Sequence, residues 1–341
     1  MEAMSETTLT AKDFATDQDV RWCPGCGDYS ILKQVQSVVA ELGRKREDIV
    51  FISGIGCSSR FPYYMETYGM HSIHGRATAV ASGLKATRPE LDVWIITGDG
   101  DSLSIGGNHL IHLLRRNFDV NILLFNNEIY GLTKGQYSPT SHEGKVTKSS
   151  PFGALDHAFN PSAVALGADC SFFARTMDRD PKHLKDILKR GNEHAGASLI
   201  EIYQNCNVFN DGAFFTFTDK ETKTGSTLFV EHGQPMTFGV YGEFGIKLDG
   251  FKPVIVNMNE GHSLDDLWIH DEHDYMKATL LSRMFDVPSE GALPRPFGVF
   301  YSQDRGTYEK ALEAQIQEAT EALGKGDLDA LIAGKHTWDI N

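Results

Sequence analysis

The chain has 341 residues, of which 41% are hydrophobic and 23% charged, and it carries a formal net charge of -14. This composition is typical of a globular protein, and the acidic balance argues against nucleic acid or an anionic membrane as a partner. No apolar run approaches the roughly 18 residues of a membrane span, and the polar N-terminus lacks a secretory pattern, so we expect a cytoplasmic protein.

Short apolar runs alternate with helical patterns along the first 206 residues. The sequence predicts strands within 47–56, 91–100 and 120–127, helices within 75–87 and 107–117, and two further helix-then-strand units over 161–176 and 181–206. Continuous apolar strands separated by helices predict a doubly wound, mostly parallel α/β sheet that is covered on both faces.

The pattern changes after residue 206. Residues 207–341 predict irregular and short β-structure, followed by one amphipathic helix that ends at Gly324. We expect this segment to be a C-terminal extension that packs on the core, residues 1–206, or on a partner subunit.

Two groups of oxygen ligands follow neighbouring predicted strands. Asp99 lies in the turn Gly98–Gly100, and Asn127 ends the next strand. Ligands of open α/β sheets bind beyond the carboxyl ends of the strands, so these side chains should meet there. A carboxylate, an amide oxygen and the backbone carbonyl of Ile129 suit an octahedral Mg²⁺, and the glycines allow a phosphate to come close.

A GDG turn alone often does no more than connect a strand to a helix. Its distance along the sequence from the paired asparagines is a more specific signal of a binding site. The sequence GDG, followed after about 25 to 30 residues by NN, matches the thiamine diphosphate motif. No G-x-G-x-x-G sequence follows a strand, and no Walker-type loop is present. The sequence therefore predicts thiamine diphosphate with Mg²⁺.

Four cysteines are expected at this same edge of the sheet. Cys23 and Cys26 form a C-x-x-C pair, while Cys57 and Cys206 each follow a predicted strand. Four converging cysteines suit a 4Fe-4S cluster, although a zinc site with four cysteine ligands would have the same spacing. A thioredoxin-like pair normally follows a strand, and none precedes Cys23. Cys170 is expected to be a buried structural thiol.

Six segments, taken in order, resemble the β subunit of 2-oxoacid:ferredoxin oxidoreductases, and the resemblance covers roughly residues 15 to 300. They are WCPGCGDYSIL, GIGCSSR, HSIHGRATAVASGLK, GDGDSLSIGGNHLIHLLRRN, NNEIYGLTKGQYSPTS and EIYQNCNVFND. The resemblance implies the diphosphate-binding half of a thiamine diphosphate-binding fold, together with one 4Fe-4S cluster.

The resemblance also assigns individual positions. It places Cys23, Cys26, Cys57 and Cys206 at the cluster, and Asp99, Asn127 and the carbonyl of Ile129 at Mg²⁺. The other cofactor-binding positions that it implies are Gly98, Gly100, Asp101, Leu132, Thr133 and His74. For His74 the alternative is a hydrogen-bonded core histidine.

Substrate choice is predicted from the segment YGLTKGQ. Lys134 follows the Mg²⁺-binding asparagine closely, so its ammonium could pair with a carboxylate at the far end of the substrate. In the family, LTK resembles members that accept 2-oxoglutarate, whereas pyruvate has no distal carboxylate. The alternative is an ordinary surface lysine. The segment His270–Asp274, HDEHD, looks metal-like but is interpreted as solvated or partner-facing.

The resemblance implies a reversible, coenzyme A-dependent oxidative decarboxylation of 2-oxoglutarate to succinyl-CoA and CO₂, with electrons passing through the cluster to ferredoxin. The aminopyrimidine of the cofactor needs a second α/β domain, which the sequence lacks, so an α-type partner subunit is expected to supply it. Two other interpretations stay open: a non-redox thiamine diphosphate decarboxylase subunit with structural zinc, and a regulatory binding subunit without chemistry.

Overall fold

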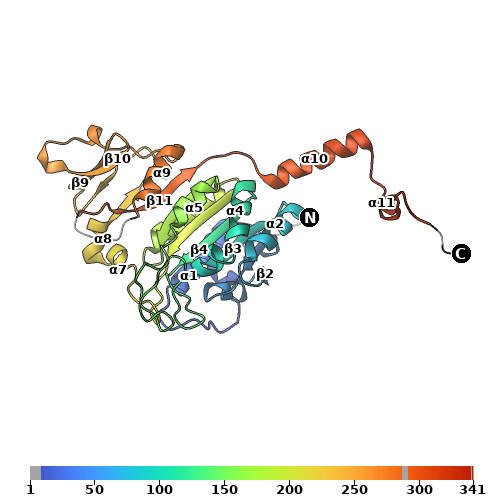
Figure 1. Ribbon diagram of the computed structural model, residues 1–341, viewed down its shortest axis with the longest axis horizontal. Coiled ribbons are helices and arrows are strands. Elements are labelled where there is room, and N and C mark those ends of the chain that lie inside the picture. The colour runs from blue at the N-terminus through green and yellow to red at the C-terminus, as the bar shows by residue number, and fades with distance from the viewer. Residues whose placement is uncertain (1–8, 286–290, 339, 341) are drawn as a thin grey trace, which may run out of the picture.

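The computed structural model describes residues 9–285, 291–338 and 340, and an eight-stranded sheet forms its core (Figure 1). In spatial order the strands are β2 (Tyr68–His71), β1 (Ile49–Ser53), β3 (Asp92–Gly98), β4 (Val120–Asn126), β6 (Ala197–Tyr203), β5 (Phe172–Met177), β11 (Arg295–Ser302) and β7 (Thr227–Val230). Neighbouring strands are parallel except β11 and β5. The predicted mostly parallel sheet is confirmed.

Helices cover both faces of this sheet, which explains why its strands are apolar on both sides. On β3, Trp94 and Ile96 belong to one hydrophobic cluster, and Val93 and Ile95 belong to the other. The first face packs against α1 (Asp28–Glu41) and α6 (Pro181–Glu193). The second packs against α2 (Ala77–Thr87), α4 (Gly107–Arg116), α5 (Pro161–Gly167) and α9 (Tyr275–Arg283).

The connection from β3 to β4 contains two helices. The GDG turn opens a five-residue helix, α3 (Asp99–Leu103), and the longer α4 begins only at Gly107. Asp99 is thus the first residue of a short helix, and the longer helix between the two strands starts later than the GDG turn.

The segment after residue 206 is more closely joined to the core than the sequence indicated. Its strands β7 and β11 extend the main sheet, while β8 (Thr237–Phe238), β9 (Phe244–Asp249) and β10 (Lys252–Asn257) form a small antiparallel sheet. Two short helices, α7 (Phe215–Thr218) and α8 (Lys220–Ser226), precede β7. The predicted division after residue 206 therefore does not separate two independent sheets.

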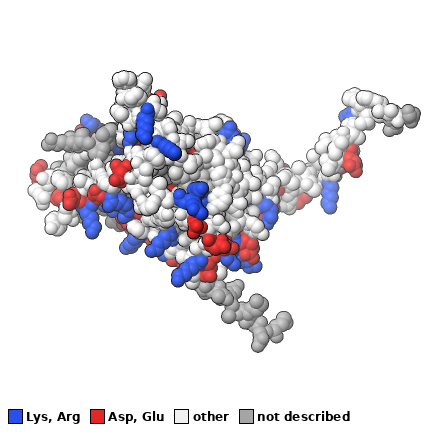
Figure 2. Space-filling view, turned by 90° about the horizontal axis from the view of Figure 1, so that it is seen from below, with Lys and Arg blue, Asp and Glu red and all other residues white. Residues whose placement is uncertain are grey.

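The chain then leaves the body as an arm, residues 308–338. It contains α10 (Tyr308–Leu323), which is capped by Gly324 as predicted, and α11 (Leu328–Ala333). Figure 1 shows it stretching away from the sheet, and Figure 2 shows it projecting from the body of the molecule. Short 3-10 helices lie at Ala11–Phe14, Arg46–Asp48, Ser58–Tyr64, Met258–Glu260 and Leu264–Asp266. Within the described ranges, no helix combines the length and apolar character that crossing a bilayer requires.

Candidate active site and cysteine cavity

The carboxyl ends of β3 and β4 bring the first group of predicted ligands to one edge of the sheet. The register pairs Gly98 with Phe125, so Asp99 and the pair Asn126–Asn127 leave neighbouring parallel strands at the same level. Asp99 is 2% exposed, Asn126 is buried and Asn127 is half-buried. We call this group, with the hydroxyl residues Ser138 and Thr140, the oxygen corner.

Two hydroxyl groups hold the Asp99 carboxylate in place. Its Oδ2 accepts hydrogen bonds from Ser138 Oγ and Thr140 Oγ1, and Thr140 Oγ1 also lies 2.9 Å from Asn126 Oδ1. Burial raises the pKa of Asp99 to about 6, although these hydrogen bonds favour the ionised form. The role of these hydroxyls was not predicted from the sequence, where their only signal is the hydroxyl-rich segment SPTS at 138–141.

Asp101 directs its carboxylate toward the protein. Its Oδ1 accepts hydrogen bonds from the backbone N–H groups of Ile55, at 3.0 Å, and Gly75, at 2.8 Å, and its Oδ2 accepts one from Thr97 Oγ1 at 2.8 Å. His74 Nδ1 lies 3.2 Å from Asp101 Oδ1, and the His74 side chain is 49% exposed. His74 is therefore not a core histidine, and Asp101 orients it while joining two loops.

The position of Gly100 has no room for a side chain, because the ring of Tyr130 packs against it. A Cβ atom at this position would lie 2.1 Å from the ring of Tyr130, whose hydroxyl donates a hydrogen bond to the Gly100 carbonyl at 3.2 Å. Any side chain here would displace that ring.

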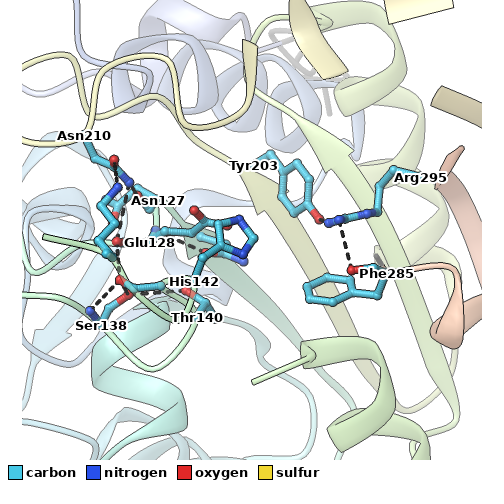
Figure 3. A network of polar contacts seen from close by, with 12 residues as sticks. Asn127, Glu128, Ser138, Thr140, His142, Tyr203, Asn210, Phe285 and Arg295 are labelled. Carbon is cyan, nitrogen blue, oxygen red and sulfur yellow. Dashed lines mark hydrogen bonds and ion pairs between the residues drawn. The ribbon is translucent and has the colours of Figure 1, made fainter. Parts of the chain in front are cut away.

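The turn after β4 is fixed by hydrogen bonds. Asn127 Oδ1 accepts the N–H of Ile129 at 3.2 Å, and Asn210 Nδ2 donates to the Asn127 carbonyl at 2.8 Å (Figure 3). Glu128 has a φ of 55°, and its buried carboxyl lies 3.4 Å from His142 Nε2. Burial raises the pKa of Glu128 to about 8. The turn thus holds the Asn127 side chain in a defined position at the edge.

The four predicted cluster cysteines line one cavity of about 240 Å³, which we call the cysteine cavity. Cys23 and Cys26 precede α1, Cys57 follows β1, and Cys206 follows β6. The structure therefore brings together three loops that are far apart in the sequence. Asn127, Gly131, Leu132, Lys134 and Gln204 are also among its lining residues.

Hydrogen bonds between these loops hold the cavity in shape. Trp22 Nε1 donates to the Cys57 carbonyl at 2.7 Å, and Asn207 Nδ2 donates to the Pro24 carbonyl at 2.6 Å. The N–H of Cys26 closes a turn onto the Cys23 carbonyl at 3.1 Å. These ties link the C-x-x-C segment to both of the other cysteine loops.

Two thiols of this cavity, those of Cys26 and Cys57, are poor acids without a bound cation. Burial, and next the nearby Asp28 carboxylate, raises the pKa of Cys57 to about 12 and also raises that of Cys26. Thiolates here therefore need a compensating positive charge, which a metal centre provides. Cys170 is different: it is buried in the hydrophobic core, as expected of a structural thiol.

Gln204 joins the oxygen corner to the cysteine cavity. Its Oε1 accepts a hydrogen bond from Asn127 Nδ2 at 2.8 Å, and its Nε2 donates to Cys26 Sγ at 3.2 Å. The residue is 1% exposed, so this amide is held by its neighbours. The role of Gln204 was not predicted from the sequence, because its position between β6 and Cys206 is the only feature there that sets it apart.

Lys134 lies at the mouth of the cysteine cavity. It is exposed and adopts a φ of 76°, in a tight turn in which the N–H of Gly135 donates to the Tyr130 carbonyl at 2.9 Å. Leu132 and Thr133, beside it, are also exposed. A second cavity, of about 470 Å³, shares Leu132 with the cysteine cavity; Arg21 and Arg60 also line both.

Comparisons with known proteins agree with this geometry. Residues 54–202 match the family of the thiamine pyrophosphate enzyme, C-terminal TPP binding domain. The 2-oxoglutarate oxidoreductase subunit KorB of Mycobacterium tuberculosis is 51% identical over 334 residues, which are 97% of this chain and 88% of that protein. The β subunit of 2-oxoacid:ferredoxin oxidoreductase 1 of Aeropyrum pernix is 46% identical over 56% of this chain and 60% of its own length.

A solved structure extends the likeness to nearly the whole chain. The 2-oxoglutarate:ferredoxin oxidoreductase from Magnetococcus marinus, with 2-oxoglutarate, coenzyme A and succinyl-CoA bound, is 32% identical with a TM-score of 0.75, over 97% of this chain and 98% of that one. Sequence and fold thus agree. The chain belongs to the β subunits of the thiamine diphosphate-dependent 2-oxoacid:ferredoxin oxidoreductases.

Proposed function

We propose that this subunit, with an α-type partner, catalyses the reversible coenzyme A-dependent oxidative decarboxylation of 2-oxoglutarate to succinyl-CoA and CO₂, and passes the electrons through its own 4Fe-4S cluster to ferredoxin. One observation carries the proposal: the hydrogen bonds of Gln204 join the oxygen corner to the cysteine cavity. The names of the relatives and the ligands of the solved neighbour support 2-oxoglutarate and coenzyme A.

Asp99, Asn127 and the carbonyl of Ile129 would hold Mg²⁺, which in turn would hold the diphosphate. The donor set fits, because all three offer oxygen and a divalent cation would ionise the buried Asp99 carboxyl. Ser138 and Thr140 orient that carboxylate by donating to one of its oxygens. Thiamine diphosphate, when bound, supplies the carbanion chemistry of 2-oxoacid decarboxylation.

The spacing of the cysteines favours a cluster over zinc. A single tetrahedral zinc, bonded at about 2.3 Å, would need its sulfur ligands about 3.8 Å apart. All four cysteines lie within the described residues, and no three of their sulfurs come within 4.8 Å of one another. A centre with several metal ions spreads its ligands more widely, so Cys23, Cys26, Cys57 and Cys206 suit a 4Fe-4S cluster better.

The mouth of the cysteine cavity carries positive charge that suits a dianionic substrate. Among the described residues, Arg21, Arg60 and Lys134 line the cavity together with a single acidic residue, Asp28, whereas the chain as a whole is acidic. Lys134 is the residue that would pair with the distal carboxylate of 2-oxoglutarate, because its exposed side chain is free to turn toward a bound anion.

A partner subunit would complete the site. Thiamine enzymes bind the aminopyrimidine on a second α/β domain, and the residues described here form one large, mostly parallel sheet and one small antiparallel sheet. The arm supports a partner as well, because its apolar side chains are exposed. Ile316 is 58% exposed and Leu323 87%; Leu331, Ile332 and Trp338 are exposed to a similar degree.

The test is anaerobic reduction of a viologen dye by the complex of both subunits. Reduction should require coenzyme A and should be faster with 2-oxoglutarate than with pyruvate. A preference for pyruvate would contradict the substrate assignment and leave the enzyme class intact. If the isolated β chain reacts with 2-oxoglutarate at the rate of the complex, the proposal that both subunits form the active site is wrong.

Two variants of Lys134 test its role in the same assay. Lys134→Ala should raise KM for 2-oxoglutarate about tenfold or more and change kcat little, because a pairing with a substrate carboxylate is lost. Lys134→Arg keeps the positive charge and should recover most of the affinity. An unchanged KM for Lys134→Ala would make this residue an ordinary surface lysine.

A further inference from the structure

The structure places two exposed histidines and one buried glutamate together, far along the chain from the oxygen corner. His232 follows β7, and Glu272 and His273 precede α9. One potential ligand atom from each of the three lies within 4.8 Å of the other two. We call these residues the histidine cluster. Glu272 and His273 belong to the HDEHD segment, to which the proposed function gives no role.

Backbone hydrogen bonds preorganise this cluster. The N–H of Gly233 donates to the His270 carbonyl at 2.8 Å, and the N–H of His270 donates to the Gln234 carbonyl at 3.0 Å, so the two segments run antiparallel side by side. The N–H of Ser302, at the end of β11, donates to the Glu272 carbonyl at 2.8 Å. His232 is therefore held beside residues 271–273 by the fold itself.

The hydrogen bonds of His273 leave one ring nitrogen available. Its Nδ1 lies 2.6 Å from the Ser302 carbonyl and can only donate there, so in the neutral ring the Nε2 lone pair is free. A backbone carbonyl that accepts from one ring nitrogen while the other binds metal is the usual arrangement of metal-binding histidines. His232 Nδ1 accepts a long, 3.3 Å contact from the N–H of Glu272 and lies 3.7 Å from Asp271 Oδ1, and a cation could replace both contacts.

The glutamate offers an unused oxygen. Arg190 Nη2 lies 2.8 Å from Glu272 Oε1, and His273 Nε2 lies 4.0 Å from the same atom. Glu272 is 6% exposed, and its buried Oε2 has no hydrogen-bond partner among the described residues. A buried carboxylate oxygen without a partner is costly, and a cation would satisfy it. Arg190 is 43% exposed, so water screens its charge in part.

We propose that His232, Glu272 and His273 bind one divalent transition-metal ion, with Zn²⁺ the best match to two imidazoles and one carboxylate. Ligand atoms around zinc lie about 3.4 Å apart, so ligand atoms that lie within 4.8 Å of one another here need to close by up to about 1.4 Å, through the two exposed imidazoles. The ion would tie the loop after β7 to the segment that leads into α9. Three protein ligands leave a fourth position for water or for a group of a partner subunit.

Metal content of the intact complex tests this site. The complex is washed with chelator, dialysed against Zn²⁺, and analysed for zinc per β chain. The double variant His232→Ala/His273→Ala should hold one zinc fewer than the unmodified chain, and each single variant should bind this zinc at least tenfold more weakly. His336→Ala removes an exposed histidine of the arm and should change nothing.

Zinc bound by the cysteines would be the same in every variant, so a difference in zinc content between variants reports on the histidine cluster alone. The same zinc content in the unmodified chain and the double variant would overturn the proposal. Because both histidines are exposed, the variants should fold, and an unchanged iron content confirms that they do. Zn²⁺ should also raise the unfolding temperature of the unmodified chain more than that of the double variant, and an equal rise in both would count against the site.

Discussion

The oxygen corner and the cysteine cavity share one edge of the sheet, but they are built in different ways. The corner has Asp99 and Asn127 at the ends of two adjacent strands, and its carboxylate is buried and already held by hydroxyl groups. The cavity collects cysteines from three distant loops, and its thiols are half-buried or exposed. The corner is thus prepared by the protein alone, whereas the cavity needs a metal centre to hold thiolates together.

Removing one cysteine should have the largest effect, because the proposed cluster needs all four of its cysteine ligands. Cys206→Ala should lose nearly all iron and all dye reduction, while thiamine diphosphate affinity changes no more than about threefold. Cys170→Ala is the matched control: it should keep its iron and lose about 1 kcal/mol of stability. Full iron content in Cys206→Ala would show that Cys206 is not a ligand of the cluster.

Asp99 tests the other side of the comparison. Asp99→Asn removes the charge that we propose binds Mg²⁺, so thiamine diphosphate should bind about 100-fold more weakly, which is about 2.7 kcal/mol, with iron content unchanged. Asp265→Asn changes an exposed carboxylate elsewhere and serves as the control. Quenching of intrinsic fluorescence by the cofactor measures the affinity. Equal affinity in both variants would contradict the assignment of Mg²⁺ to Asp99.

Gln204 should affect both regions at once, because it contacts both. Gln204→Leu removes the N–H that donates to Cys26 Sγ and the oxygen that accepts from Asn127. The cluster potential should become more negative, on the order of tens of millivolts, and thiamine diphosphate should bind about three- to tenfold more weakly.

Asn207→Leu is the matched control for this variant, since Asn207 lines the same cavity but donates to a backbone carbonyl. This variant should bind thiamine diphosphate with unchanged affinity. Redox titration followed by electron paramagnetic resonance gives the potential. If Gln204→Leu changes neither quantity, the two regions are neighbours without a functional link.

The smallest effect is expected at a supporting hydroxyl. Thr140→Val keeps the shape of the side chain but removes one hydrogen bond to Asp99. Losing one such bond costs about 1 kcal/mol, so thiamine diphosphate should bind about fivefold more weakly. Thr320→Val on the arm is the control and should match the unmodified chain. An effect as large as that of Asp99→Asn would mean that Thr140 is itself a ligand.

The sequence predicted what depends on local pattern. Apolar runs gave the parallel strands, and the spacing of Asp99 and Asn127 over one strand–helix–strand unit indicated that they lie at one edge. Ser138, Thr140 and Gln204 could not be assigned a role, because their contacts exist only once the loops after several strands have been placed.

The addition of β11 was missed for a related reason. This strand pairs antiparallel with β5, and more than a hundred residues separate the two along the chain. A repeat of helix and strand predicts parallel neighbours, and it carries no information on a strand that returns from a distant segment. The histidine cluster was hidden in the same way, because His232 lies far from the HDEHD segment in the sequence.

The most direct test is to mix the anaerobic complex with 2-oxoglutarate and coenzyme A, without ferredoxin or dye, and to record the electron paramagnetic resonance spectrum of the cluster proposed for the β subunit. We predict iron and sulfide in the amounts of one 4Fe-4S cluster per β chain, and a reduced-cluster signal that appears with 2-oxoglutarate and is lost in both Cys206→Ala and Asp99→Asn. Zinc without iron in the cysteine cavity, or a cluster that substrate never reduces, would contradict the account.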